Sequence, residues 1–141
     1  MAGYSATPLP KKLGINEGDT VATLSEPPGF PQTLGQLPSG TRVVHDLRGH
    51  RDVVVAFFTA RAAFERRLAA LTKAIFPDGG LWIAWPKKAS KVPTDITEDV
   101  VRAVALPTGL VDNKVCAIDD VWSGLRLVVR VENRGPRGRR M

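Results

Sequence analysis

Cysteine is nearly absent from this 141-residue sequence: Cys116 is the only one, which excludes an intramolecular disulfide. Long apolar runs are also missing. No stretch approaches the roughly 18 apolar residues of a membrane-spanning helix, and nothing after Lys11 and Lys12 resembles a signal peptide. Aromatic residues are few, at 6%, but 43% hydrophobic and 24% charged residues are typical of one globular domain. We therefore expect a cytoplasmic, globular protein with no membrane partner.

Acidic residues are absent from the last eight positions, where four of the arginines lie: Arg134, Arg137, Arg139 and Arg140. They leave the rest of the chain with a charge of +2 out of the total of +6. Glycine, proline and arginine dominate residues 133–141, which predicts a disordered tail. Weak, non-specific binding to nucleic-acid phosphates through Arg137, Arg139 and Arg140 is one function to consider, although no aromatic residue is interleaved for base stacking.

Alternating strand and helix patterns predict one α/β domain over residues 18–132, preceded by an N-terminal arm of residues 1–17. Continuous apolar runs at residues 53–58 and 81–85 are typical of buried parallel strands. Between them, Phe64, Leu68, Leu71 and Ile75 form one helical stripe, for which Thr59 is the expected N-cap. Asp95 followed by Glu98 has the spacing of a capping box for a second helix, which ends near Leu106.

Further strands are expected at residues 20–24, 41–45, 113–118 and 125–131. The pattern predicts a three-layer, Rossmann-like, mostly parallel sheet of five to six strands with a C-terminal antiparallel hairpin. The strand at residues 41–45 is the least certain element, because only a few residues separate it from the next strand and a parallel crossover usually needs about a dozen. Its direction, and its existence as a regular element, stay open.

The segment IFPDGGLWIAW, residues 75–85, resembles the helix end, Gly-Gly turn and fifth strand of class I S-adenosylmethionine-dependent methyltransferases. GDTVATL, residues 18–24, sits where that family has its first strand, and the final hairpin resembles its sixth and seventh strands. The resemblance covers residues 18–131 and implies the family fold, although the chain is too short for the third strand and its helix. It also implies an acidic, glycine-rich turn after the first strand.

The segment at that turn is instead SEPPGF, residues 25–30. Pro27 and Pro28 remove backbone N–H donors and fix the chain where glycine freedom is wanted. We therefore expect the fold without its cofactor, and with no catalytic or metal-binding residues.

Longer stretches resemble a family of short bacterial proteins of unknown function, common in actinobacteria. They are GYSATPLPKKLGI (3–15), DVVVAFF (52–58), WPKKAS (85–90), TDITEDVVR (94–102) and ALPTGLVDNKVCAIDDVWSGLRLV (105–128). This resemblance spans most of the chain and implies no established activity.

Polar residues directly after a central strand are the first candidate site. Lys87, Lys88 and Ser90 should emerge at the carboxyl edge of the sheet, where open α/β sheets bind ligands, and would suit a phosphate or carboxylate. Ser25 and Glu26 end the first strand and would contact a ligand there. The alternative for the lysine loop is a solvated basic loop closed by Trp85.

A second candidate cluster, Asp119, Asp120 and Trp122, lies on the hairpin. The two acids would bind a cation or pair with Lys87 and Lys88, or else they are turn residues beside an aromatic plug. Cys116 is expected to be a buried thiol, and His45 and His50 to be structural.

The sequence thus favours a non-catalytic Rossmann-like module that binds a small anionic ligand or a protein partner. A reduced S-adenosylmethionine-dependent methyltransferase-like enzyme is the first alternative, and a nucleic-acid accessory protein using the tail is the second. A homodimer through an apolar surface left by Trp85 and Trp122 is a further alternative for the assembly.

Overall fold

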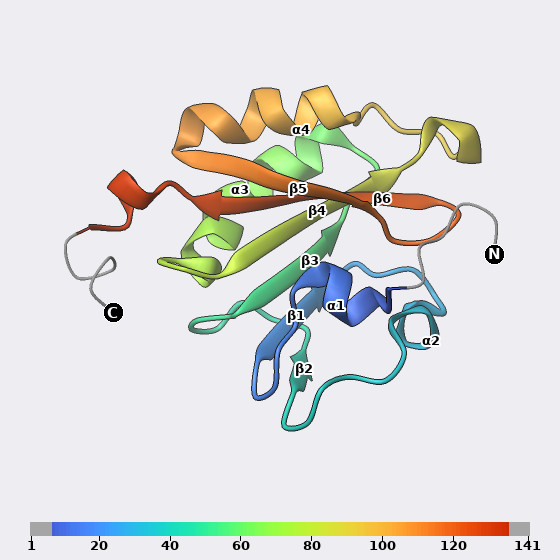
Figure 1. Cartoon of the computed structure of the whole chain (residues 1–141). Coiled ribbons are helices and arrows are strands. Elements are labelled where there is room, and N and C mark those ends of the chain that lie inside the picture. Colours follow the sequence, from blue (N-terminus) through green and yellow to red (C-terminus); the bar gives the residue numbers. More distant parts are fainter. Residues whose placement is uncertain (1–6, 136–141) are drawn as a thin grey trace.

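The computed structural model describes residues 7–135, which form a six-stranded sheet between two layers of helices (Figure 1). The strands are β1 (Thr20–Leu24), β2 (Arg42–Val44), β3 (Val53–Phe57), β4 (Gly80–Pro86), β5 (Leu110–Ala117) and β6 (Trp122–Val129). Their order across the sheet is β2-β1-β3-β4-β6-β5. The first four strands are parallel, and β6 runs antiparallel to both β4 and β5. The expected Rossmann-like sheet with a C-terminal hairpin is confirmed.

Helices cover both faces of the sheet, but unequally. α3 (Arg61–Ile75) and α4 (Glu98–Ala105) pack on one face, and the short α1 (Leu9–Leu13) and α2 (Phe30–Leu34) pack on the other (Figure 1). Single 3-10 turns occupy Lys88–Ser90, Leu106–Thr108 and Val131–Asn133. Because both faces are covered, every residue of β3 and β4 is buried. Among residues 7–135, no helix has both the length and the apolarity to span a bilayer.

The N-terminal arm packs against the sheet through α1. Leu13 is completely buried, and its carbonyl accepts a hydrogen bond of 2.9 Å from the indole Nε1 of buried Trp82. Leu9 and Ile15 belong to the same apolar cluster as alternate residues of β1, β3 and β4. This face of the sheet therefore depends on the arm for its cover.

The uncertain strand at residues 41–45 exists as β2 and is parallel to β1, with Val21 opposite Val43. It does not neighbour β3 in the sheet, because β1 lies between them. β2 has only three residues, so the chain needs to run back only a short distance from the end of β2 to the start of β3. Residues 45–52 span that distance without a helix, since an extended residue spans about 3.3–3.6 Å.

The helix caps differ from the expected ones. Asp95 does not begin its own helix; its Oδ1 accepts the backbone N–H of Arg61 at 2.6 Å, at the start of α3. α4 is capped instead by Thr97, whose hydroxyl accepts from the N–H of Val100 at 3.2 Å. The N-cap position of α3 is Ala60 rather than Thr59, and it supplies no side-chain hydrogen bond. A carboxylate from a distant loop therefore replaces a local cap.

An ion pair joins α4 to the hairpin. Arg102 Nε donates to Asp112 Oδ2 of β5 at 2.9 Å, and Arg102 Nη2 lies 2.6 Å from Glu98 Oε2 on its own helix. The hydrogen bond from Arg102 lowers the pKa of the Asp112 carboxyl below its ordinary value of 3.8. The folded state therefore favours the charged form of this carboxyl.

We expect Asp112→Asn to lower the free energy of unfolding near neutral pH and to make no difference in strong acid. A carboxyl whose pKa is lowered by folding stabilises the protein fully above its unfolded value. That stabilisation is lost as the pH falls through the lower folded value. Urea denaturation of both proteins below and above pH 3.8 measures the difference. Glu17→Gln, an exposed substitution with no ion pair among the described residues, is the control, and a difference independent of pH would contradict the prediction.

Candidate functional site

The strand order creates a switch point between β1 and β3. The chain leaves the carboxyl end of β1 toward α2 on one face of the sheet, and leaves the carboxyl end of β3 toward α3 on the other face. In open α/β sheets, ligands bind in the crevice outside the carboxyl ends of the strands at such a point. The strand order therefore predicts a binding site formed by residues 25–30, after β1, and residues 58–60, after β3.

A hollow of about 470 Å³, which we name the switch-point crevice, lies there. Its volume is within the range of small-molecule sites, about 300–1,000 Å³. The residues that line it are Ser25, Phe57, Phe58, Thr59, Ala60, Ala63, Arg66, Arg67 and Trp122. The crevice thus combines both strand ends, one turn of α3 and the first residue of β6.

Aromatic rings form the inner wall of the switch-point crevice. Phe57 packs edge-on against Phe30, with ring centroids 5.0 Å apart, and against Trp122, at 5.1 Å. Arg66 and Arg67 are exposed on α3, and neither has an acidic partner among residues 7–135. The crevice is therefore apolar within and positively charged at its rim.

The loop after β1 bends sharply at two positions. Ser25 has a φ of 57° and Gly29 a φ of 87°, both in the left-handed region. For a non-glycine residue such as Ser25 this conformation is uncommon, and it often marks a functional turn. Phe30 closes the bend by donating its N–H to the carbonyl of Pro27 at 3.1 Å. The turn is thus formed without the glycine freedom expected at its start.

Three polar side chains meet at the ends of β1 and β2, and we name them the edge cluster: Thr23, Glu26 and His45. The hydroxyl of Thr23 donates to Glu26 Oε2 at 2.8 Å and lies 3.0 Å from His45 Nδ1. His45 Nδ1 also lies 3.2 Å from Glu26 Oε2. Thr23 is 2% exposed, whereas the His45 side chain is 64% exposed. The buried hydroxyl holds a carboxylate and an imidazole beside solvent.

The structure therefore brings Ser25 and Trp122 together in the crevice and places Glu26 in the adjoining edge cluster. Sequence reasoning selected these three but missed Thr23 and treated His45 as structural. The available signals were a hydroxyl residue between apolar ones, Thr23 in the strand TVATL, and a histidine directly after the next strand.

The lysine loop after β4 has a separate location. Lys88 lines another hollow, of about 460 Å³, together with Trp85 and Thr94. The hydroxyl of Ser90 donates to the carbonyl of Lys87 at 2.6 Å, so it stabilises its own 3-10 turn. Neither Lys87 nor Ser90 is part of the switch-point crevice. Trp85 is 6% exposed, so it does not form the apolar dimer surface considered from the sequence.

The hairpin acids have a turn geometry. Asp119 Oδ1 accepts the N–H groups of Val121 and Trp122, each at 2.8 Å. The backbone N–H of Lys87 donates to the carbonyl of Val121, which joins the lysine loop to the hairpin through main chain. Within the described residues, no ion pair links Lys87 or Lys88 to Asp119 or Asp120.

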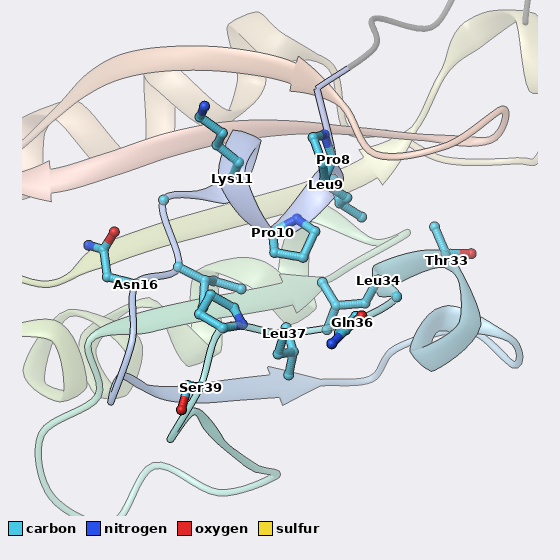
Figure 2. Close-up of a pocket in the computed structure, with 14 residues that line it drawn as sticks. Pro8, Leu9, Pro10, Lys11, Asn16, Thr33, Leu34, Gln36, Leu37 and Ser39 are labelled. Carbon is cyan, nitrogen blue, oxygen red and sulfur yellow. The ribbon is translucent and has the colours of Figure 1, made fainter.

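Another hollow, of about 920 Å³, lies between α1 and the segment after α2 (Figure 2). Pro10, Leu34 and Leu37 gather at its centre, while Lys11 points outward (Figure 2). Its lining includes neither an acidic residue nor a histidine. Without a carboxylate or an imidazole it offers less for acid–base chemistry, so the switch-point crevice and edge cluster form the better candidate site.

Neither a family model nor a curated protein sequence matches the chain. The resemblance to a bacterial family of unknown function thus has no support from these comparisons. Arg137, Arg139 and Arg140, on which the nucleic-acid alternative depends, lie outside the described residues.

Solved structures of methyltransferases do match. A SAM-dependent methyltransferase from Aquifex aeolicus is 17% identical with a TM-score of 0.59, over 84% of this chain and 87% of that one. The magnesium protoporphyrin IX methyltransferase ChlM from Synechocystis PCC 6803, with bound SAH, is 14% identical with a TM-score of 0.52. That match covers 80% of this chain and 74% of ChlM. A ribosomal protein L11 methylase from Lactobacillus delbrueckii subsp. bulgaricus is 11% identical with a TM-score of 0.52. That match covers 80% of this chain and 71% of the methylase.

These neighbours correct the function favoured by the sequence. The expectation of a non-catalytic module binding a small anion or protein partner is wrong, and the methyltransferase-like alternative has the better support. Pro27 and Pro28 do not prevent a sharp bend after β1, because the loop bends at Ser25 and Gly29. The chain has the Rossmann-like fold of S-adenosylmethionine-dependent methyltransferases.

Proposed function

We propose that this chain binds S-adenosylmethionine across the switch-point crevice and the edge cluster, and acts as a methyltransferase. One observation carries the proposal: Ser25 from the end of β1 and residues 57–60 at the end of β3 line a single ligand-sized crevice at the switch point. Among sheets of this kind, that is the position at which ligands bind.

The residues present fit the chemical groups of that cofactor. Its sulfonium is a cation, and cations bind favourably to aromatic faces such as those of Phe57 and Trp122. Its ribose hydroxyls are donors, which suit the carboxylate of Glu26 at the end of the first strand. Its amino-acid carboxylate would bind Arg66 or Arg67 at the rim. When bound, the cofactor supplies an electrophilic methyl group.

The two prolines are compatible with this cofactor. Their missing N–H groups would weaken a loop that must hold a phosphate, because backbone donors carry much of that interaction. S-adenosylmethionine has no phosphate. The chain's own contribution is then to hold the cofactor by side chains, with Thr23 fixing the Glu26 carboxylate at 2.8 Å and aromatic rings excluding water.

We expect calorimetric titration of the full chain to detect binding of S-adenosylmethionine and of its demethylated product, with dissociation constants on the order of 10 μM. Glu26→Gln should weaken both at least about tenfold, because a hydrogen bond to a charged acceptor contributes about 1.5–3 kcal/mol. The glutamine oxygen can still accept the hydrogen bond from Thr23, so the fold should be retained.

Glu17→Gln is the matched control, since Glu17 is exposed before β1 and outside both the crevice and the edge cluster. It should bind like the unmodified protein. Absence of binding by the unmodified protein at millimolar cofactor, or equal binding by Glu26→Gln, would contradict the proposal. Transfer of a labelled methyl group to candidate acceptors then tests catalysis.

A further inference from the structure

A small pocket of about 220 Å³ lies on the α1 face of the sheet, apart from the switch-point crevice. We name it the basic pocket; its lining residues are Lys12, Leu13, Gly14, Asn113, Lys114 and Arg126. Half of these residues are cations and none is acidic. It shares no lining residue with the crevice, so it is a separate site from the one proposed for methyl transfer.

Arg126 is a partly buried cation without a counterion. All 14 acidic residues of the sequence lie within residues 7–135, and none is within ion-pair distance of it. Of its five N–H donors, one makes a hydrogen bond to another side chain in this range, a long one of 3.3 Å to Asn113 Oδ1. Burial lowers the pKa of Arg126, and nearby Arg134 lowers it further. Such a charge costs free energy unless an anion compensates it.

A β-bulge in β5 keeps acid out of the basic pocket. Residues two apart on a regular strand share a face, which would put Asp112 and Lys114 side by side. The register shift between them instead pairs Asp112 with Leu127 and Lys114 with Arg126. Asp112 therefore bonds to Arg102 on the α4 face, while Lys114 joins Arg126 on the α1 face. Bulges often re-aim side chains in this way beside functional sites.

Glycine at position 80 makes room for the guanidinium. A Cβ there would lie 2.7 Å from both Nε and Nη2 of Arg126. The guanidinium thus lies against the backbone at the start of β4. Because residue 80 has no side chain, none covers the N–H groups of Arg126 that lack an acceptor within residues 7–135.

The lysines have a partial explanation without a ligand. Lys114 Nζ donates to the carbonyl of Lys12 at 2.8 Å, and Lys12 Nζ donates to the carbonyl of Ala117 at 3.2 Å. The carboxyl end of a helix attracts cations, and Lys12 is in the last turn of α1. Each ammonium nevertheless keeps donors to spare. Arg126 has no comparable backbone acceptor among the described residues.

We propose that the basic pocket binds the phosphate group of a phosphorylated ligand, with Arg126 as its main contact and Lys12 and Lys114 completing the site. A guanidinium donates two parallel hydrogen bonds to a phosphate, and the lysines add point charges. The volume is below that of a typical drug-sized site, so the pocket takes the phosphate and leaves the rest of the ligand outside.

The test titrates full-length, isotope-labelled protein with sodium pyrophosphate at constant ionic strength, following side-chain resonances and the melting temperature. Arg126→Gln should weaken binding at least about tenfold, and Lys114→Gln should weaken it severalfold. Arg42→Gln, an exposed arginine on β2 outside the basic pocket, is the control and should bind normally. Without ligand, Arg126→Gln should melt no lower than the unmodified protein, because the substitution removes an unpaired charge.

A second titration, with a short single-stranded oligonucleotide, identifies the source of the phosphate. Loss of pyrophosphate binding in Arg126→Gln supports a small phosphorylated molecule, and loss of oligonucleotide binding alone supports a nucleic-acid backbone. If neither probe binds, or if both Arg126→Gln and Lys114→Gln bind as well as Arg42→Gln, the proposal is overturned. Lys114 is exposed, so its variant decides the outcome if Arg126→Gln fails to fold.

Discussion

Phe57→Ala is expected to lower the free energy of unfolding by about 3–5 kcal/mol, because it removes a buried ring from a packed core. Phe57 is 3% exposed and makes edge-on contacts with both Phe30 and Trp122. Urea denaturation measures the loss. Phe76→Ala is the matched control: that ring is 44% exposed, so its removal should cost much less. A cost for Phe57→Ala no larger than the control would mean that the ring does not support the core.

Phe57→Leu separates packing from recognition at the same position. Leucine keeps the position apolar and leaves a smaller cavity than alanine does, so Phe57→Leu should cost less than Phe57→Ala and the fold should persist. The aromatic face that we assign to the sulfonium is lost, however, and S-adenosylmethionine should bind several-fold more weakly. Calorimetric titration of the folded variant measures its affinity for S-adenosylmethionine. Unchanged affinity would remove Phe57 from the proposed cofactor site while leaving its structural role intact.

Patterns within one element were sufficient to predict much of this fold. The apolar run at residues 53–58 predicted a strand covered on both faces, and β3 is buried throughout. The stripe from Phe64 to Ile75 is the buried side of α3. Alternation on the last strand placed Leu125 and Leu127 in the core and Arg126 on the other face. In each case the period of burial follows from the geometry of a single helix or strand.

The candidate site was less predictable because its residues meet through strand pairing. His45 reaches Thr23 only because β2 is parallel to β1, with Val44 opposite Ala22. The sequence did not decide the direction of β2. The lysine loop after β4 was the favoured candidate because it follows a central strand, but the switch point depends on the order β2-β1-β3, which no local pattern encodes. The bulge that separates Asp112 from Lys114 is likewise a property of the pairing with β6.

Gly79→Ala is expected to lower the free energy of unfolding by about 3 kcal/mol, at the upper end of the usual cost of overpacking. A Cβ at this position would lie 2.6 Å from the carbonyl oxygen of Arg51 and 3.1 Å from those of Asp52 and Ile75. All three atoms are backbone, so no side-chain rotation relieves the overlap. Gly79 also donates its N–H to the carbonyl of Ile75 at 2.7 Å, which fixes the turn between α3 and β4.

Substitutions at two other glycines, Gly49 and Gly80, serve as controls for Gly79→Ala. Gly49→Ala meets no atom within 4 Å and costs only the strain of a φ of +82°, about 1–2 kcal/mol. Gly80→Ala meets the Arg126 guanidinium, which can move, so it should cost less than Gly79→Ala and should weaken pyrophosphate binding at the basic pocket. Chemical denaturation ranks the three variants. If Gly79→Ala proves as stable as Gly49→Ala, the backbone must yield at the start of β4, and the close approach of Arg51 does not hold this strand in place.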